Sequence, residues 1–245
     1  MRFDGRVALI TGAGRGIGAA TAQLFAREGA KVAVSDLDEG PAKEIAGPIG
    51  GIAIACDVSD RAQVDRMVER TVKELGRLDV LVTCAGILRD NLLFKMTDED
   101  WDDVIDTHLK GTFLCARAAQ KAMVEQKYGK MVFLSSTSAL GNRGQANYSA
   151  AKAGIQGLAR TLAIELGVFN VNVNTVAPGF VETRMMRATA ERMRVDYDAM
   201  KEGAALQIPL RRVGQPEDIA HVIAFLCSDE CSYVSGQTLY VRGGP

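Results

Sequence analysis

Residues 7–18 decide the fold, and they read Val7-Ala8-Leu9-Ile10-Thr11-Gly12-Ala13-Gly14-Arg15-Gly16-Ile17-Gly18. The first four residues are a short apolar run, which is the pattern of a strand covered on both faces. Glycines follow at once, and apolar residues then recur with helical spacing through Leu24 and Phe25. A glycine-rich turn between a buried strand and a helix lets backbone N–H groups approach a pyrophosphate at the helix N-terminus. The stretch therefore predicts a dinucleotide-binding turn.

The alternation of strand and helix patterns continues along the whole chain. Further strands are predicted at 31–36, 52–56, 80–83, 131–134, 171–176 and 238–241, and further helices at 62–75, 101–120, 148–166 and 216–227. Strands separated by helices form right-handed βαβ units, which build a parallel sheet between two layers of helices. We expect one α/β domain over residues 1–245 with a Rossmann-like, doubly wound sheet. Residues 1–130 would mainly bind the dinucleotide, and residues 131–245 would form the catalytic and substrate-binding part.

Residues 179–212 break this regular pattern and carry four methionines among charged residues. A long insertion late in such a fold is commonly a lid over a binding site. Two ordinary surface helices explain the same composition equally well. We interpret 179–212 as a substrate lid and keep the second interpretation open.

The composition is that of an ordinary globular protein, with 47% hydrophobic and 24% charged residues among 245 and a formal net charge of −1. A charge so close to zero gives no reason to expect nucleic acid or an anionic membrane as a partner. The five cysteines show no CxxC spacing and the chain has two histidines, so neither a zinc site nor a disulfide framework is expected. The N-terminus lacks an apolar signal region, and no segment approaches the length of a membrane span. We expect a cytoplasmic protein.

The second predicted strand ends at an acid, Asp36. A carboxylate at this point can accept hydrogen bonds from both adenosine ribose hydroxyls and would repel the 2′-phosphate of NADP. Arg15 in the glycine turn is a counter-signal, because a cation there can bind that phosphate. The balance predicts NAD as the cofactor rather than NADP.

Tyr148 and Lys152 are four residues apart in a run with helical spacing. Residues at that spacing share one face of a helix. A free tyrosine titrates near ~10 and is a poor acid or base at neutral pH, but a nearby ammonium favours the phenolate and lowers the phenol pKa. Taken alone, such a pair is usually surface decoration. The pair becomes a candidate for proton transfer only through its context.

That context is a set of motifs in a fixed order, namely Thr11-Gly12-(x)3-Gly16-x-Gly18, Asp57-Val58, Ala85-Gly86, Tyr148-(x)3-Lys152 and Pro178-Gly179. In order and spacing they resemble the motifs of the classical short-chain dehydrogenase/reductase family, and the resemblance covers essentially the whole chain. Within that family, the runs 86–93, 144–148 and 177–183 are similar to those of 3-oxoacyl-[acyl-carrier-protein] reductase-like members.

The resemblance implies an NAD(H)-dependent oxidoreductase that interconverts a secondary alcohol and a ketone, most plausibly a 3-hydroxyacyl and a 3-oxoacyl thioester. Tyr148 would be the catalytic acid/base, and Lys152 would lower its pKa and bind the nicotinamide ribose. Beyond Asp36, Tyr148 and Lys152, the implied cofactor-binding residues are Gly12, Arg15, Gly16, Ile17 and Gly18 at the pyrophosphate, Asp57 and Val58 at the adenine, Ala85 and Gly86 at the adenosine ribose side, and Pro178, Gly179, Val181 and Thr183 at the nicotinamide. Family members are mostly homotetramers, so the same assembly is expected. A dehydrogenase of a small cyclic alcohol, diol or sugar alcohol is the alternative, and a catalytically weak NAD-binding scaffold is a third reading.

The family also implies a serine that hydrogen-bonds the substrate oxygen, and two candidates are open. Counting back from the tyrosine gives Ser135, whereas counting forward from the start of the fifth strand gives Ser136. A strand has a rigid two-residue side-chain period, while the loop before the tyrosine can absorb a deletion. We therefore predict Ser136, with Ser135 as the alternative.

Two positions depart from the family pattern. Thr83-Cys84 stands where the family usually has two asparagines, one of which props the sheet. His108 stands where the family has a fourth catalytic residue, an asparagine that holds a water of a proton relay. If the backbone carbonyl holds that water, the side chain is free to change; alternatively, His108 titrates within the relay.

Overall fold

Seven parallel strands form the central sheet of the computed structural model, which describes residues 1–245. In chain order the strands are β1 (Val7–Thr11), β2 (Lys31–Asp36), β3 (Ile52–Ala55), β4 (Val80–Thr83), β5 (Gly129–Leu134), β6 (Val171–Pro178) and β7 (Thr238–Val241). Their spatial order is β3-β2-β1-β4-β5-β6-β7, so the direction of winding reverses between β1 and β4. The predicted Rossmann-like, doubly wound α/β fold is confirmed.

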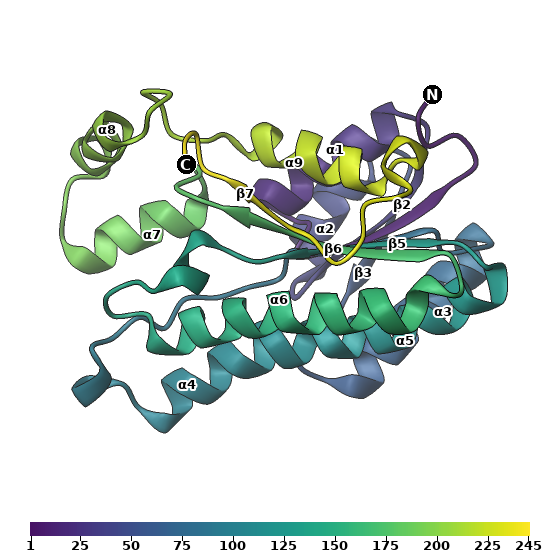
Figure 1. Cartoon of the computed structure of the whole chain (residues 1–245), viewed down its shortest axis with the longest axis horizontal. Coiled ribbons are helices and arrows are strands. Elements are labelled where there is room, and N and C mark those ends of the chain that lie inside the picture. Colours follow the sequence, from purple (N-terminus) through teal and green to yellow (C-terminus); the bar gives the residue numbers. More distant parts are fainter.

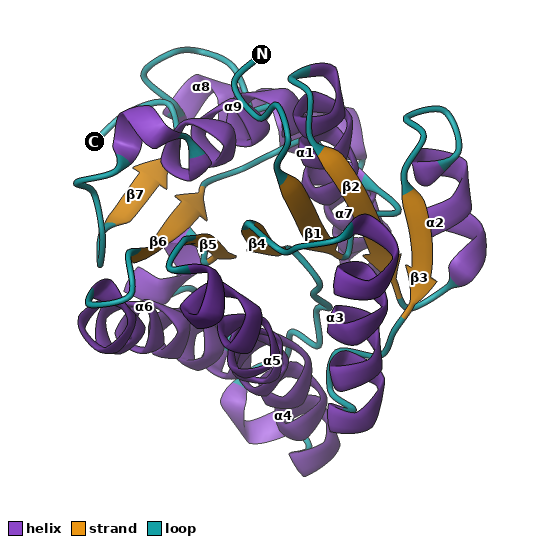
Figure 2. Ribbon diagram, turned by 90° about the vertical axis from the view of Figure 1, so that its right-hand side faces the viewer, coloured by secondary structure: helices purple, strands orange, loops and turns teal.

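Helices cover both faces of the sheet (Figures 1 and 2). One face carries α1 (Gly16–Arg27), α2 (Glu39–Ala46) and α9 (Pro216–Cys227), and the other carries α3 (Arg61–Leu75), α5 (Gly111–Gln126) and α6 (Ala146–Gly167), with α4 (Asp98–Ile105) packed against α6. Neighbouring residues of one strand therefore enter different cores: Ala8 and Ile10 face α1 and α9, while Leu9 faces α3 and α5. This is why the strands read as continuous apolar runs rather than alternating ones.

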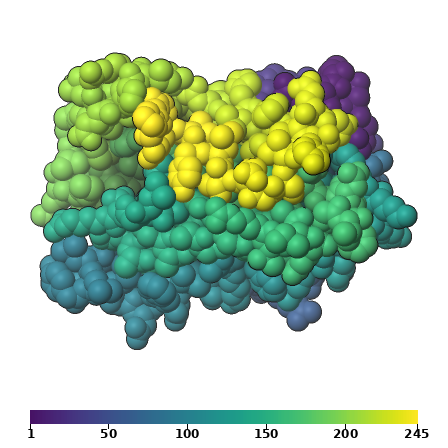
Figure 3. Space-filling view, viewed as in Figure 1, coloured from purple at the N-terminus to yellow at the C-terminus, as the bar shows by residue number.

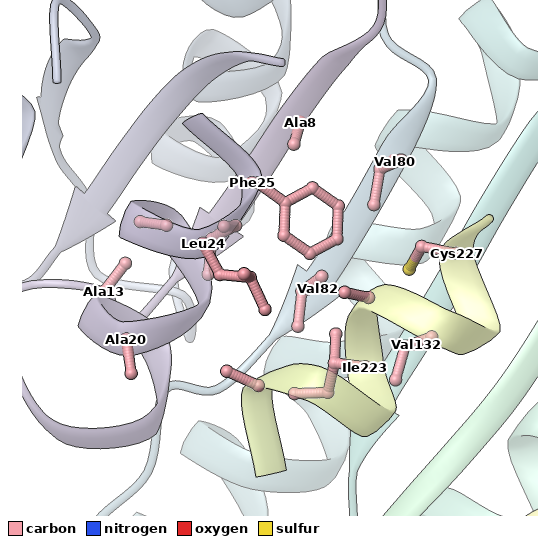
Figure 4. Close-up of a cluster of buried hydrophobic side chains, with 14 of the residues drawn as sticks. Ala8, Ala13, Ala20, Leu24, Phe25, Val80, Val82, Val132, Ile223 and Cys227 are labelled. Atoms are coloured by element: carbon pink, nitrogen blue, oxygen red, sulfur yellow. The ribbon is translucent and has the colours of Figure 1, made fainter. Parts of the chain in front are cut away.

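The core beneath α1 and α9 is built around Phe25, which is fully buried. Its ring lies between Leu24 of the same helix, Ile223 of α9 and Val80 and Val82 of β4 (Figure 4). Burying a side chain of this size stabilises the fold by about 2–3 kcal/mol relative to exposing it. The packing fixes α1, and with it the glycine turn, against the end of β1.

The helix predicted at 101–120 is wrong in its bounds and its regularity. Helix α4 begins at Asp98 because Thr97 and Asp100 form a capping box, and helix α5 runs on to Gln126, where Lys127 takes a left-handed conformation. Between α4 and α5, residues Asp106–Lys110 form a π-helical turn. Such insertions into a helix are frequent at functional sites. The short helix α2 was not predicted, because Gly40 and Pro41 mask its pattern.

The segment 179–212 forms two helices, α7 (Arg184–Met193) and α8 (Tyr197–Gln207). They stand at one end of the molecule beside the C-terminal residues, which are yellow in Figure 3. Thr183 caps the first turn of α7 by accepting a hydrogen bond from the N–H of Met186. No helix in the chain combines the length and the apolar character needed to cross a membrane.

Candidate active site

One cleft of about 1020 Å³ lies at the carboxyl edge of the sheet, over the reversal between β1 and β4. This is the place where open α/β sheets bind their ligands. Every residue predicted to bind the cofactor lines it: Gly12, Arg15, Gly16, Ile17, Gly18, Asp36, Asp57, Val58, Ala85, Gly86, Tyr148, Lys152, Pro178, Gly179, Val181 and Thr183. Ser135, Ser136 and His108 line the same cleft. The structure thus brings together residues from six strand ends that lie far apart in the sequence.

The glycine turn has the shape that a pyrophosphate needs. Gly12 has a φ of +59°, and a Cβ at this position would lie 2.6 Å from the backbone nitrogen of Ala85. A Cβ on Gly18 would collide with the carbonyl oxygen of Gly12. The first turn of α1 contains no acidic residue and no side chain caps it, so its N–H groups are available to an anion. These features fit a dinucleotide.

Asp36 lies half-buried at the end of β2, where its carboxylate is held by two backbone groups. Oδ2 accepts a hydrogen bond from the N–H of Gly14 at 2.9 Å, and Oδ1 accepts one from the N–H of Leu37, also at 2.9 Å. Each carboxylate oxygen can accept a further hydrogen bond. Arg15 is exposed at the rim of the cleft and forms no ion pair.

Tyr148 and Lys152 lie on one face of α6, as their spacing predicts. The Lys152 ammonium lies 5.4 Å from the centroid of the Tyr148 ring and donates a hydrogen bond to the carbonyl of Leu134 at 2.5 Å. Ser136 comes from the end of β5 and hydrogen-bonds Tyr148. The three side chains thus form a cluster in which two hydroxyl groups can contact the same substrate oxygen.

The expected lowering of the Tyr148 pKa by Lys152 is not a property of the protein chain alone. Enclosure in the cleft raises the pKa of Tyr148 to about 12, and the hydrogen bond with Ser136 only partly opposes this. Burial also lowers the pKa of Lys152 to about 7, since the cation loses its hydration. In the chain itself, the phenol is therefore protonated at neutral pH and Lys152 is only partly charged.

The two candidate serines have different partners. Ser135 is buried; its hydroxyl donates to the backbone carbonyl of Lys152 at 2.9 Å and accepts from the amide of Gln156 at 3.0 Å. Gln156 in turn contacts the hydroxyl of Tyr240 on β7 at 3.2 Å. The Ser135 hydroxyl therefore both donates and accepts within the protein, whereas the Ser136 hydroxyl accepts from the N–H of Ser138 at 3.1 Å and lies beside Tyr148. This geometry favours Ser136, which stays a prediction.

His108 lies in the π-helical turn, 2% exposed, with its ring edge-on to Tyr148 at a centroid distance of 5.0 Å. Its Nε2 is 2.8 Å from the carbonyl oxygen of Ile87 and 3.1 Å from the N–H of the same residue. Burial, and then the charge of Lys152, lower the pKa of His108 to about 3. The ring is therefore neutral at physiological pH, which disfavours the interpretation that His108 titrates in a relay.

Thr83, the first departure in the family's double-asparagine motif, is also integrated into the fold. Its buried hydroxyl lies 3.4 Å from that of Thr112 on α5. The side chain thus links the end of β4 to the helix beside it.

Sequence reasoning missed Asn147, which is fully buried directly before Tyr148. Its amide donates to the backbone carbonyls of Arg89 at 3.0 Å and Asp100 at 2.8 Å, and its side-chain oxygen accepts from the N–H of Tyr148 at 2.7 Å. This side chain ties the first turn of α6 to the loop after β4 and to α4. The only signal in the sequence was a polar residue in the first turn of a buried helix.

Comparison with known proteins identifies relatives over the full length of the chain. The family described as enoyl-(acyl carrier protein) reductase matches residues 12–245. The 3-oxoacyl-[acyl-carrier-protein] reductase FabG of Escherichia coli is 42% identical over 100% of this chain and 98% of its own, and FabG of Thermotoga maritima is 46% identical over 100% and 99%. The short-chain reductase protein NovJ of Streptomyces niveus is 46% identical over 97% of this chain and 93% of its own.

A crystal structure described as ribose-5-phosphate isomerase from Brucella melitensis has the same fold, with a TM-score of 0.94 and 33% identity over 99% of this chain and 93% of that one. One fold can carry different activities, so fold similarity alone does not choose the reaction. The family match and the full-length relatives do. With a match that runs from the first glycine of the nucleotide turn to the C-terminus, and with reductases at least 42% identical end to end, this chain belongs to the short-chain dehydrogenase/reductase family and is an oxidoreductase acting on CH–OH groups.

Proposed function

We propose that this oxidoreductase interconverts a 3-hydroxyacyl and a 3-oxoacyl thioester with NAD(H) as cofactor. The observation that carries the proposal is the meeting of Ser136, Tyr148 and Lys152 in the same cleft as the nucleotide turn. The relatives named 3-oxoacyl-[acyl-carrier-protein] reductase support the thioester as the substrate class.

The proposed chemistry assigns each residue one task. The bound nicotinamide supplies or accepts the hydride. In the reductive direction, Tyr148 donates a proton to the substrate oxygen, and Ser136 donates a hydrogen bond to the same oxygen as negative charge develops on it. A phenol with a pKa of about 12 is fully protonated at neutral pH, which suits a proton donor. Lys152, held by the carbonyl of Leu134, is the residue we assign to the nicotinamide ribose.

The NAD preference rests on Asp36. Its carboxylate is fixed at the cleft by Gly14 and Leu37 and cannot turn away without losing both bonds. A 2′-phosphate beside this carboxylate would place two anions together, which is unfavourable. We expect kcat/KM to be at least ~10-fold higher with NADH than with NADPH. Equal or better kcat/KM with NADPH would contradict the role of Asp36.

The substrate side of the cleft is apolar where α7 begins. Phe180, just before α7, and Met185 and Met186 in its first turn line the cleft there. Methionine adapts to irregular apolar groups such as an acyl chain. We therefore propose that α7 is the part of the predicted lid, 179–212, that roofs the substrate, whereas α8 packs on α7 and does not line the cleft.

A steady-state screen tests the proposed function. The purified protein is assayed with both cofactors against 3-oxoacyl and 3-hydroxyacyl thioesters, small cyclic alcohols, diols and sugar alcohols. The highest kcat/KM on a 3-oxoacyl or 3-hydroxyacyl thioester supports the proposal. Turnover confined to the small alcohols would replace the substrate class, and no turnover despite NAD binding would indicate a non-catalytic NAD-binding protein.

Tyr148→Phe tests the assignment of the acid/base group. Removing the phenol hydroxyl should lower kcat by about 10²–10⁴-fold, the usual contribution of general acid–base catalysis. NADH binding, measured by fluorescence titration, should stay nearly unchanged. Residual turnover above a tenth of the wild-type rate would contradict the assignment.

We also propose a homotetramer. Large apolar side chains are exposed on the elements that the family uses for assembly: Phe113 on α5 is 43% exposed, Ile164 on α6 is 80% exposed and Leu239 on β7 is 43% exposed. Burying them between subunits would remove apolar area from water. Sedimentation equilibrium gives the assembly state directly, and a monomer at micromolar concentration would contradict this proposal.

A further inference from the structure

Asp90 lies in the loop after β4, between helix α7 and the segment that precedes Tyr148. One carboxylate oxygen, Oδ2, accepts a hydrogen bond from the Gln145 amide at 3.0 Å and forms an ion pair with the Arg192 guanidinium at 2.9 Å. The Asp90 side chain is only 17% exposed, and its other oxygen, Oδ1, is buried without a partner. A carboxylate this enclosed needs its cation, because an unpaired buried charge is costly.

The loop that carries Asp90 is also joined to the start of α6 by one backbone bond and one side-chain bond. The N–H of Asn91 donates to the carbonyl of Gly144 at 2.8 Å, and the amide of Asn147 donates to the carbonyl of Arg89 at 3.0 Å. Residues 89–91 and 144–147 therefore form one unit that ends at Tyr148. Arg192 is the only side chain of α7 that pairs with this unit.

We propose that Asp90 is a positioning residue for the reaction: through Arg192 it holds helix α7 over the cleft, and through Gln145 it holds the segment that carries Tyr148. The proposal rests on the proposed function in one respect, the role of Tyr148 as acid/base. Arg192 lies in the last turn of α7. Its bond therefore fixes the end of the roof that is farthest from the anchored residue Thr183.

Asp90 also acts on Tyr148 through its charge. The groups that act on or contact the phenol are Ser136, Lys152, His108 and Asp90. Among them His108 is neutral, and the carboxylate of Asp90 contributes to the raised pKa of Tyr148. Arg192 partly neutralises that carboxylate while α7 is in place. Loss of Arg192 and loss of the Asp90 charge should therefore shift the phenol pKa in opposite directions.

The first arm of the test follows α7 itself and needs no substrate. Hydrogen–deuterium exchange is measured on the wild type, Arg192→Gln, Asp90→Asn and the control Arg194→Gln. Arg194 is exposed, two residues further along, and has no ion pair. We expect residues 184–193 to exchange at least ~3-fold faster in Arg192→Gln and Asp90→Asn, called the latch variants below, and at the wild-type rate in the control. Unchanged exchange in Arg192→Gln, or an equal increase in Arg194→Gln, would overturn the proposal.

The second arm is kinetic. Arg192→Gln should raise the substrate KM about fivefold, the effect of losing a partly exposed ion pair, with kcat within about twofold of the wild type. The double variant Asp90→Asn/Arg192→Gln should have the KM of the single variants rather than their product, because both remove one interaction. In the oxidation direction Tyr148 must be deprotonated to act as the base, so the rise of kcat with pH should move to higher pH in Arg192→Gln and to lower pH in Asp90→Asn. Multiplicative KM effects, or pH shifts in one direction, would overturn the proposal.

The two arms separate failure of this inference from failure of the proposed function. If no thioester is turned over but α7 exchanges faster in the latch variants, the proposed function fails and the contact between Asp90 and α7 stands. If thioesters are turned over and the latch variants match Arg194→Gln in both arms, the inference fails and the proposed function stands.

Discussion

At the amino edge of the sheet the carboxylate of Asp79 is fully buried and fully paired, whereas at the carboxyl edge two buried atoms, His108 Nδ1 and Asp90 Oδ1, have no partner. Asp79 accepts from the N–H of Val7 at 2.9 Å and from the Arg77 guanidinium at 2.8 Å and 2.6 Å. Buried polar atoms are normally satisfied, so exceptions need a reason. Two of the exceptions, His108 Nδ1 and Asp90 Oδ1, lie at the carboxyl edge, and His108 lines the cleft itself.

Two buried lysines make the same comparison. Lys130, near the amino edge, is 2% exposed and donates to the side chain of Asn172 at 2.6 Å, with Asp229 near enough to favour its charge. Lys152 is 3% exposed, donates to one backbone carbonyl, and has no carboxylate among the groups that act on its pKa. The two lysines are therefore equally buried, but only Lys130 has a carboxylate near it that favours its charge, and the proton of Lys152 is held more weakly.

The largest expected effect is the difference in kcat between alanine variants of the two serines at the carboxyl edge. Ser136→Ala should lower kcat about 100-fold, the loss of one hydrogen-bond donor to the developing oxyanion. Ser135→Ala should lower kcat by less than about 10-fold and reduce the free energy of unfolding by about 1–2 kcal/mol, because Lys152 and Gln156 lose a buried partner. Single-turnover rates and urea unfolding of both variants measure this. The reverse ranking of the two rates would assign the substrate contact to Ser135.

Next in size is the pairing at the amino edge. Asp79→Asn keeps the shape and removes the charge that Arg77 and Arg6 face, so it should reduce the free energy of unfolding by about 2–3 kcal/mol. Asp229→Asn is the matched control at the same edge; Asp229 is 66% exposed, and its loss should cost below about 1 kcal/mol. Neither should change kcat by more than about twofold. A large fall in kcat for a fully folded Asp79→Asn variant would mean that pairing at the amino edge also affects the reaction at the carboxyl edge.

The sequence predicted local structure better than it predicted contacts between distant segments. Strand positions and the glycine turn depend on local patterns, an apolar run and a sterically forced glycine such as Gly12, and these were confirmed. Contacts between distant segments leave no such pattern. Asp90 and Arg192 pair across 102 positions of the sequence. The side chain of Asn147 binds backbone carbonyls, which any residue could supply, so the sequence does not mark its partners. These contacts follow from packing rather than from periodicity.

The interruption after α4 shows the same limit on a smaller scale. Residues 101–120 keep a helical apolar pattern, so the sequence predicted one regular helix. The π-helical turn at Asp106–Lys110 alters the hydrogen-bond spacing over a stretch too short for the apolar pattern to reveal. The pKa of Tyr148 shows this limit too, because spacing shows that Lys152 is near but not that burial of the phenol itself raises its pKa.

The contrast between the buried lysines should be visible in the pH dependence of stability. Burial disfavours the Lys152 cation in the folded state, so between its folded pKa of about 7 and its usual value of 10.5 the unfolded chain binds more protons. Stability from this group therefore rises with pH across that range. Relative to Lys152→Met, the wild type should gain about 2 kcal/mol between pH 7 and pH 9, measured by urea unfolding.

Lys130→Met is the matched control for that measurement. Burial lowers the pKa of Lys130 too, but the charge of Asp229 opposes the shift. The gain of the wild type over Lys130→Met between pH 7 and pH 9 should therefore be smaller. An equal or larger gain would show that the two edges treat their buried cations alike.

The smallest expected effect concerns His108. A ring with a pKa of about 3 does not titrate between pH 5 and pH 9, so the kcat profile of His108→Asn should keep the shape of the wild type. An asparagine amide can donate to the carbonyl of Ile87 and accept from its N–H at once, whereas one imidazole nitrogen serves only one of them. We therefore expect kcat within about fivefold of the wild type, which corresponds to a change of less than about 1 kcal/mol in the activation free energy. Gly86→Ala, whose methyl group would collide with the ring of His108, should be the more damaging change. Loss of a titrating limb between pH 5 and pH 8 in His108→Asn would instead make His108 part of the proton path, and the unpartnered Nδ1 would be its exit.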